Sequence, residues 1–185
     1  SRQAAVLYAA VLAQDKQRDF VAARALLARL VSVTSADPAA ARLTRLLSAE
    51  VALDSGEPQR VATLVDPQAT TRPDVMLTAQ AGLRTGHARD VAQQMQTWVA
   101  RDSRDATGWQ LLSEAYAAQG LTLRSIRASA EAQVALLDYA AAVDRFKAAQ
   151  DLVRKGGDVD HIEASIIDTR VREVELLLRE QALER

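Results

Sequence analysis

Residues 109–120 have the sequence Trp109-Gln110-Leu111-Leu112-Ser113-Glu114-Ala115-Tyr116-Ala117-Ala118-Gln119-Gly120. Leu112, Ser113 and Tyr116 follow Trp109 at spacings of three, four and seven, which place side chains on one stripe of an α-helix. Gly120 then supplies the residue type that commonly ends a helix. The stretch therefore predicts a helix that packs through one stripe and stops at a tight turn.

A second helical pattern follows at Tyr139, Ala142, Phe146 and Ala149, where aromatic residues and alanines alternate at spacings of three and four. Small residues on one helix leave room for bulky residues from a neighbouring helix. We expect helices of these two kinds to interlock in pairs.

Breaker residues repeat along the chain. Gly56, Gly86 and Gly120 lie 30 and 34 residues apart, and Pro38 and Pro73 lie 35 apart. A period near 34 residues, divided into two helices by a turn, resembles that of tetratricopeptide repeats. The first repeat follows the pattern more loosely than the one that begins near residue 106.

The composition agrees with a helical chain and limits the function. Hydrophobic residues make up 49% of the 185 residues and aromatic residues 4%, which disfavours both disorder and strands. The 23 basic and 24 acidic residues are interspersed, so the clustered basic footprint of a nucleic-acid-binding protein is not expected. There is no cysteine, and no apolar run reaches the roughly 20 residues that span a bilayer.

The predicted fold is an all-α, tetratricopeptide-repeat-like solenoid of about ten helices with a C-terminal capping helix, in a single domain over residues 1–185. The predicted helices are 3–14, 19–33, 39–54, 58–65, 74–85, 88–101, 106–119, 122–136, 139–155 and 159–183. They form repeats at about 3–37, 38–72, 73–105 and 106–155, followed by the cap at 159–183. The helix at 122–136 is expected to serve two successive repeats.

Two segments interrupt the regular pattern. Residues 54–73 contain three prolines and predict a shortened helix with a longer loop. Gly156 and Gly157 stop the helix before them, and Asp158 is a predicted N-cap for the last helix.

The sequence contains few residues in arrangements that could support catalysis. The two histidines, His87 and His161, lie 74 residues apart, and no second histidine follows His161 at the four-residue spacing of a zinc-protease helix. We expect no catalytic residue, no metal site and no cofactor in this chain, and we interpret both histidines as surface residues.

Binding of other proteins or peptide segments is the remaining function. Polar residues outside the packing stripe of first helices predict a partner-binding groove, and a solvated face is the alternative for each of them. The candidates are Tyr8, Glu50, Gln80, Arg84, Gln110, Glu114, Arg124, Arg127 and Glu131. The chain contains no asparagine, which disfavours the Lys and Asn clamp that binds chaperone C-terminal carboxylates. Homo-oligomerisation stays open.

A more specific likeness covers residues 106–175. The order of 111–120, then Ala128-Ser129-Ala130-Glu131, 136–142, Phe146-Lys147-Ala148-Ala149 and the Ile/Asp/Arg-rich helix 162–173 resembles the repeat tail of periplasmic zinc metalloproteases of the BepA (β-barrel assembly-enhancing) type. The resemblance implies a periplasmic protein whose zinc and protease domain lie upstream of Ser1. No catalytic residue carries over, because no position matches the protease motif.

The resemblance leads to the expectation of a non-catalytic tail that recruits substrates or outer-membrane assembly partners. A free-standing adaptor or scaffold without a protease is the alternative, and an enzyme acting through its own groove is a third class. A His-Glu-x-x-His motif encoded upstream of Ser1 would separate the first two hypotheses. The sequence starts without an initiator Met or a secretory signal, and we expect it to belong to a longer protein.

Overall fold

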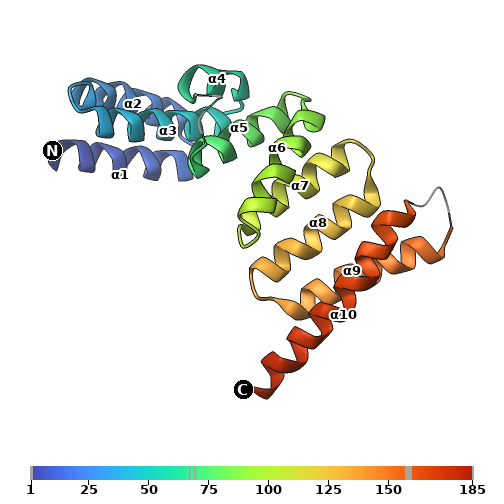
Figure 1. Cartoon of the computed structure of the whole chain (residues 1–185). Helices are drawn as coiled ribbons and strands as arrows, with labels where there is room; N and C mark the ends of the chain where they lie inside the picture. The colour runs from blue at the N-terminus through green and yellow to red at the C-terminus, as the bar shows by residue number, and fades with distance from the viewer. Residues whose placement is uncertain (1, 67, 69, 157–159, 185) are drawn as a thin grey trace. The chain divides into compact units, whose positions relative to one another are not determined.

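A computed structural model describes residues 2–66, 68, 70–156 and 160–184, and over these ranges it contains ten α-helices, one 3-10 turn and no strand (Figure 1). The all-α prediction is confirmed. The elements are α1 (Arg2–Lys16), α2 (Phe20–Thr34), α3 (Pro38–Asp54), η1 (Pro58–Arg60), α4 (Val61–Leu64), α5 (Arg72–Arg84), α6 (Ala88–Arg101), α7 (Ala106–Ala118), α8 (Thr122–Ala135), α9 (Tyr139–Arg154) and α10 (His161–Leu183).

Aspartates fix where half of the helices begin. The carboxylates of Asp19, Asp37, Asp105, Asp138 and Asp160 accept hydrogen bonds from backbone N–H groups in the first turns of α2, α3, α7, α9 and α10. Such caps satisfy donors that have no partner within the helix, and each is worth about 1 kcal/mol. Asp160 is the observed cap of α10, while the predicted cap at position 158 lies outside the described residues.

Residues with positive φ end several helices. Gly56, Gly86 and Gly120 have φ of 80°, 84° and 73° after α3, α5 and α7. Glycine takes this conformation without a steric penalty, which explains why glycines punctuate the sequence at the observed period. Arg18 and Leu137 take the same conformation after α1 and α8, and there no glycine marks the turn.

The irregular segment 54–73 contains a short helix, as predicted. Pro58 begins the one-turn η1, and α4 that follows is only four residues long. Val61 and Val65 are buried against α3 and α5, so the short helix still closes the core of its repeat.

Contacts divide the chain into two compact units, residues 1–85 and 86–185. In the first unit α1 packs on α2 and α3, and α3 packs in turn on α5, so α1, α3 and α5 form one layer. One core cluster joins α1, α2 and α3 around Val11, Leu30 and Leu47, and a second joins α3, α4 and α5 around Leu53. The single domain of four repeats stays a prediction.

In the second unit each helix from α6 to α10 packs on the next, and α8 also contacts α10 (Figure 1). The core of α8, α9 and α10 surrounds Phe146, which is fully buried beside Ala130, Ala142 and Ile167. The helix α8 therefore serves α7 on one side and α9 and α10 on the other, as the sequence predicted. Among the described residues, no helix combines the length and apolar character needed to cross a membrane.

The contact between α6 and α7 depends on a glycine inside a helix. A Cβ atom at Gly108 would lie 2.7 Å from Cδ1 of Trp98 and 3.3 Å from Cγ1 of Val99. The indole Nε1 of Trp98 also donates to Asp105, the cap of α7, at 3.0 Å. The ring is therefore held where the added methyl group would have to go.

We expect Gly108→Ala to lower the free energy of unfolding, although alanine favours helices. The gain in helix propensity is about 1 kcal/mol, whereas overpacking a fixed core site costs about 1–3 kcal/mol. Urea denaturation of the variant beside Thr107→Ala, an exposed neighbour, provides the measurement and its control. A Gly108→Ala protein at least as stable as Thr107→Ala would contradict this account.

Candidate functional site

The nine predicted binding residues fall on five helices. In the first unit Tyr8 lies on α1, Glu50 on α3, and Gln80 and Arg84 on α5. In the second unit two lie on α7 and three on α8, and these are Gln110, Glu114, Arg124, Arg127 and Glu131.

Tyr8 and Glu50 are neighbours across the α1–α3 contact. The Tyr8 ring is half-buried against the apolar cluster of α1, α2 and α3, while Glu50 is exposed. Burial raises the pKa of the Tyr8 hydroxyl, and the charge of Glu50 raises it further. The phenol therefore stays a neutral hydrogen-bond donor at the surface of this layer.

Gln80 and Arg84 lie one turn apart on α5. Arg84 is exposed, and its guanidinium donates to the backbone carbonyl of Leu53 at the end of α3. A cation at the carbonyl end of a helix is favourable, because the unpaired C=O groups carry partial negative charge. The four predicted residues of the first unit thus belong to the connected layer of α1, α3 and α5.

An acidic group that was not predicted from the sequence lies at the end of this layer. Asp15 continues the apolar stripe of Leu7 and Val11 at the same four-residue spacing, and it is only 7% exposed. Its carboxyl group lies beside that of Asp54 on α3, and among the described residues its buried Oδ1 has no hydrogen-bond partner. An acid in register with core positions was the sequence signal that could have revealed the group.

Burial is the main cause of an unusual protonation equilibrium in this group. It raises the pKa of Asp15, and Asp54 raises it further through the hydrogen bond and its charge, against the opposing charges of Lys16 and Arg18. Partial burial also raises the pKa of Glu50, with Asp54 and Asp15 adding to the effect. Two neighbouring carboxyl groups disfavour each other's charged form, because two charged carboxylates repel each other.

The candidates on α7 form a pair on the surface. Gln110 and Glu114 are both exposed, and the Gln110 amide donates to the Glu114 carboxylate at 3.2 Å. They are four residues apart, so this contact lies within one face of the helix.

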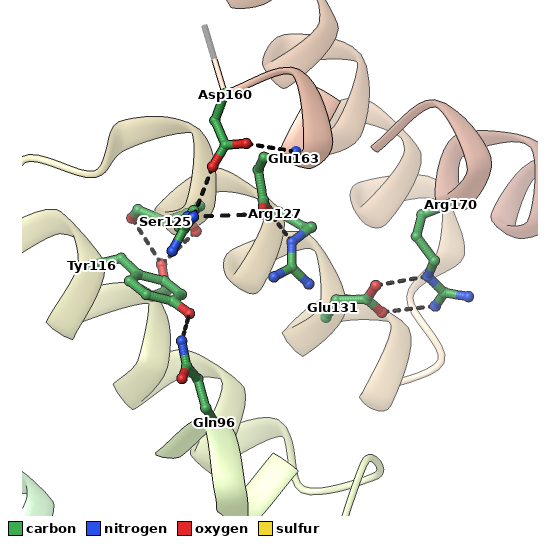
Figure 2. Close-up of polar contacts among 10 residues, drawn as sticks. Gln96, Tyr116, Ser125, Arg127, Glu131, Asp160, Glu163 and Arg170 are labelled. Carbon is green, nitrogen blue, oxygen red and sulfur yellow. Dashed lines mark hydrogen bonds and ion pairs between the residues drawn. The ribbon is translucent and has the colours of Figure 1, made fainter. Parts of the chain in front are cut away.

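The candidates on α8 face α10 and are bound to it (Figure 2). Glu131 is buried, and its two oxygens accept from Nε and Nη2 of Arg170, each at 2.7 Å. Arg127 donates to buried Glu163, beside which Arg124 makes a second ion pair. That pair joins the Arg124 guanidinium to Asp160 at 2.7 Å.

These contacts connect α8 to residues one repeat further along the chain, at separations of 36 and 39. The hydrogen bond from Arg124, together with the backbone N–H of Glu163, lowers the pKa of the cap Asp160. Glu131 raises the pKa of Arg170. The three α8 residues therefore hold α10 in place, and their binding of a partner stays a prediction.

A small hollow in the first unit lies between α3 and α5. It has a volume of about 310 Å³ and is lined by charges of both signs and by Leu46 and Leu64. Arg42 in its wall donates to Asp74 at 2.6 Å and to Thr71 at 2.8 Å, so this guanidinium is already bound.

The histidines occupy exposed positions. His87 precedes α6 and His161 is the first residue of α10. Within the described ranges, no three or more histidine, cysteine, aspartate or glutamate side chains are arranged to hold a metal ion.

The comparisons with known proteins add no family. No family model matches the chain, and a search of curated proteins finds no match.

We expect Arg170→Ala to destabilise the second unit, because it leaves the Glu131 carboxylate buried without its partner. Breaking a fully buried pair costs about 3–5 kcal/mol, and the 29% exposure of the Arg170 side chain reduces the expected loss to about 2 kcal/mol. Chemical denaturation gives the value. The control Arg154→Ala removes an ion pair with Asp151 that is exposed on both sides, and should change stability by less than about 0.5 kcal/mol.

We expect Asp15→Asn to stabilise the protein at pH 7 by about 1 kcal/mol, because its amide can donate to Asp54 and carries no charge to bury. The sign of the pH dependence follows from the raised pKa of Asp15: the folded chain holds a proton that the unfolded chain releases. The wild type therefore loses stability relative to the variant as the pH rises above the ordinary pKa of an aspartate side chain.

Denaturation curves of both proteins from pH 4.5 to pH 8 measure this difference. It should be smallest at the acidic end and grow to a plateau. An equal difference at every pH would contradict a proton held by Asp15.

Proposed function

We propose that this chain is a protein-interaction module that binds an extended polypeptide segment on the layer of α1, α3 and α5. The observation that supports the proposal is the placement of Tyr8, Glu50, Gln80 and Arg84 on adjacent helices of that layer. These residues offer a neutral phenol, a carboxylate, an amide and a guanidinium, a mixture that can bind both backbone and side chains of a peptide.

The first unit is a better candidate than α8 because of what its side chains already bind. On α8, Arg127 and Glu131 are engaged by acids and a base of α10. A partner there would have to displace charged groups that are largely buried, which is costly. On α1 and α3, Tyr8 and Glu50 face each other at a surface that is partly open to solvent.

Rigid helices give such a surface an energetic advantage. The apolar clusters behind α1 and α3 fix the backbone before a partner arrives, since Val11, Leu47 and Val51 are almost fully buried. Most of the ordering cost then falls on the bound segment, and little binding energy is spent on the module.

The likeness to the repeat tail of BepA-type proteases adds a cellular setting to the proposal. In that setting the module recruits substrates or outer-membrane assembly partners to a zinc protease in the periplasm. Sequencing the gene upstream of Ser1 tests it: a His-Glu-x-x-His motif supports the protease tail, and an open reading frame without one favours a free-standing adaptor.

Selection from a random peptide display library tests the binding function itself. We expect the purified 185-residue chain to enrich a reproducible set of peptides against a bare support. A photoreactive phenylalanine analogue at Gln80 should then cross-link to these peptides. The same analogue at Arg29, which is exposed on α2, is the matched control and should not.

Two results would overturn the proposal. The first is failure to enrich any peptide above the bare support. The second is cross-linking at position 29 that equals or exceeds cross-linking at position 80, because it would place the bound segment away from the α1, α3 and α5 layer.

A further inference from the structure

The last helix has an apolar side that no other part of the described chain covers. Among the described elements, α10 contacts only α8 and α9, and it buries Ile167, Val171 and Val174 against them. Single exposed apolar residues are ordinary on a protein surface, whereas several along one side of a helix are typical of an interaction surface. The opposite side of α10 carries four exposed large apolar residues, which are Ile162, Ile166, Leu176 and Leu183.

These exposed residues follow a regular spacing. Ile162, Thr169, Leu176 and Leu183 succeed one another at intervals of seven residues, and Ile166 lies beside them. Seven residues are close to two turns of an α-helix, so the four side chains form a central row along about 32 Å of α10. A helix with two apolar sides, one of them unused within the chain, is expected to pack against a further helix.

Charged side chains flank the central row, with one sign on each side. Each residue advances an α-helix by about 100°, so the positions three and four before a row member lie about 60° to one side and about 40° to the other. The first position is occupied by Glu173 and Glu180, and the second by Arg172 and Arg179, all of them exposed. Within the chain, one oxygen of Glu173 accepts from Arg170.

The outer charges differ from those that α10 turns toward its neighbours. Glu163, Arg170 and Glu175 each bind an opposite charge on α8 or α9. The side chains of Arg172 and Glu180, in contrast, form no ion pair with any described residue. The outer side of α10 therefore combines an apolar row with charges that the chain itself leaves largely unpaired.

We propose that this side of α10 binds the same side of α10 in a second copy of the chain, with the two helices parallel about a two-fold axis. Rotation about an axis along the helices brings each member of the central row against its own copy. It also brings the acidic side of each helix against the basic side of the other. Arg172 then faces Glu173 of the second copy, and Arg179 faces Glu180 of the second copy.

The charge pattern selects a second copy in this orientation. A two-fold contact uses one surface twice, so that surface must be complementary to itself. An axis perpendicular to the helices would make them antiparallel and would bring acidic side against acidic side and basic side against basic side. That arrangement is repulsive, whereas the parallel one pairs opposite charges along the whole row.

The size of the contact determines how tight the dimer is expected to be. A stable interface typically buries about 800 Å² on each partner, and one pair of helix sides about 32 Å long covers less than that. We therefore expect a reversible dimer with a Kd on the order of 10 μM. The contact lies on the second unit and is separate from the peptide-binding layer proposed for α1, α3 and α5.

Sedimentation velocity of the full chain from about 1 μM to about 300 μM, on either side of the expected Kd, tests self-association. Leu176→Glu places an acid in the central row beside its own copy and should weaken the dimer at least about tenfold. Leu43→Glu is the matched control, because Leu43 on α3 is 53% exposed and Leu176 is 56% exposed. The control should keep the affinity of the wild type, and both variants should melt as the wild type does.

Two single charge reversals test the flanking rows. Arg179→Glu makes both sides of this part of α10 acidic, and Glu180→Lys makes both sides basic. Each variant alone should dimerise about tenfold more weakly than the wild type. An equimolar mixture should recover the affinity of the wild type, because an acidic helix then meets a basic one.

Disulfide cross-linking tests the orientation, since the chain has no cysteine of its own. Ile162→Cys should give a covalent dimer under mild oxidation, because parallel helices bring position 162 against itself within disulfide reach. In an antiparallel pair the two copies of this position would lie at opposite ends of the contact. Val21→Cys, at an exposed position of α2, is the control and should cross-link much more slowly.

Several results would overturn the proposal. A wild type that stays monomeric at the highest concentration would exclude a second copy and leave the row to a different partner. An equal loss in Leu43→Glu, or a mixture of charge variants that binds no better than either alone, would place the contact elsewhere. Cross-linking at position 162 no faster than at position 21 would overturn the parallel arrangement. Each of these results leaves the proposed binding of peptides to the first unit unchanged.

Discussion

Close approach of consecutive helices at buried alanines is the constraint on which the rest of the structure depends. Ala23, Ala49, Ala130 and Ala142 are fully buried, and bulky side chains from neighbouring helices occupy the space beside them. Dispersion contacts between such surfaces are individually small but numerous, and they hold only at close range. Because this packing fixes each helix against its neighbours, the polar residues on the outer faces of α1, α3 and α8 are fixed as well.

Much of this architecture could be predicted from residues 1–185, because its signals are local. The 3.6-residue periodicity, the aspartate caps and the glycines with positive φ each act within one helix or one turn. The expected helix at 88–101 coincides with α6, and the other boundaries shift by at most two residues, apart from the division of 58–65 into η1 and α4. The turns at Arg18 and Leu137 show the limit, since residue type there gives no sign of positive φ.

The candidate site was less predictable, because sequence spacing identifies a face of a helix but not what covers that face. Arg127 and Glu131 lie at positions of α8 outside the predicted packing stripe, as a binding surface requires, yet α10 presents Glu163 and Arg170 to them. Residues one repeat apart meet at the α8–α10 contact, so a polar residue outside the packing stripe can contact the following repeat as well as solvent or a partner. Asp15 was missed for the opposite reason. Its spacing from Leu7 and Val11 is that of a core residue, but its carboxyl group is not the apolar side chain expected in a core.

This contrast gives the two acidic arrangements different meanings. Glu131 is buried with both oxygens bound to Arg170, so its charge is compensated within the chain and contributes to the α8–α10 contact. Asp15 is buried to a similar degree, but its carboxyl group lies beside that of Asp54, and its Oδ1 has no hydrogen-bond partner among the described residues. A compensated charge specifies how helices pack, whereas an uncompensated one raises the energy of the free state.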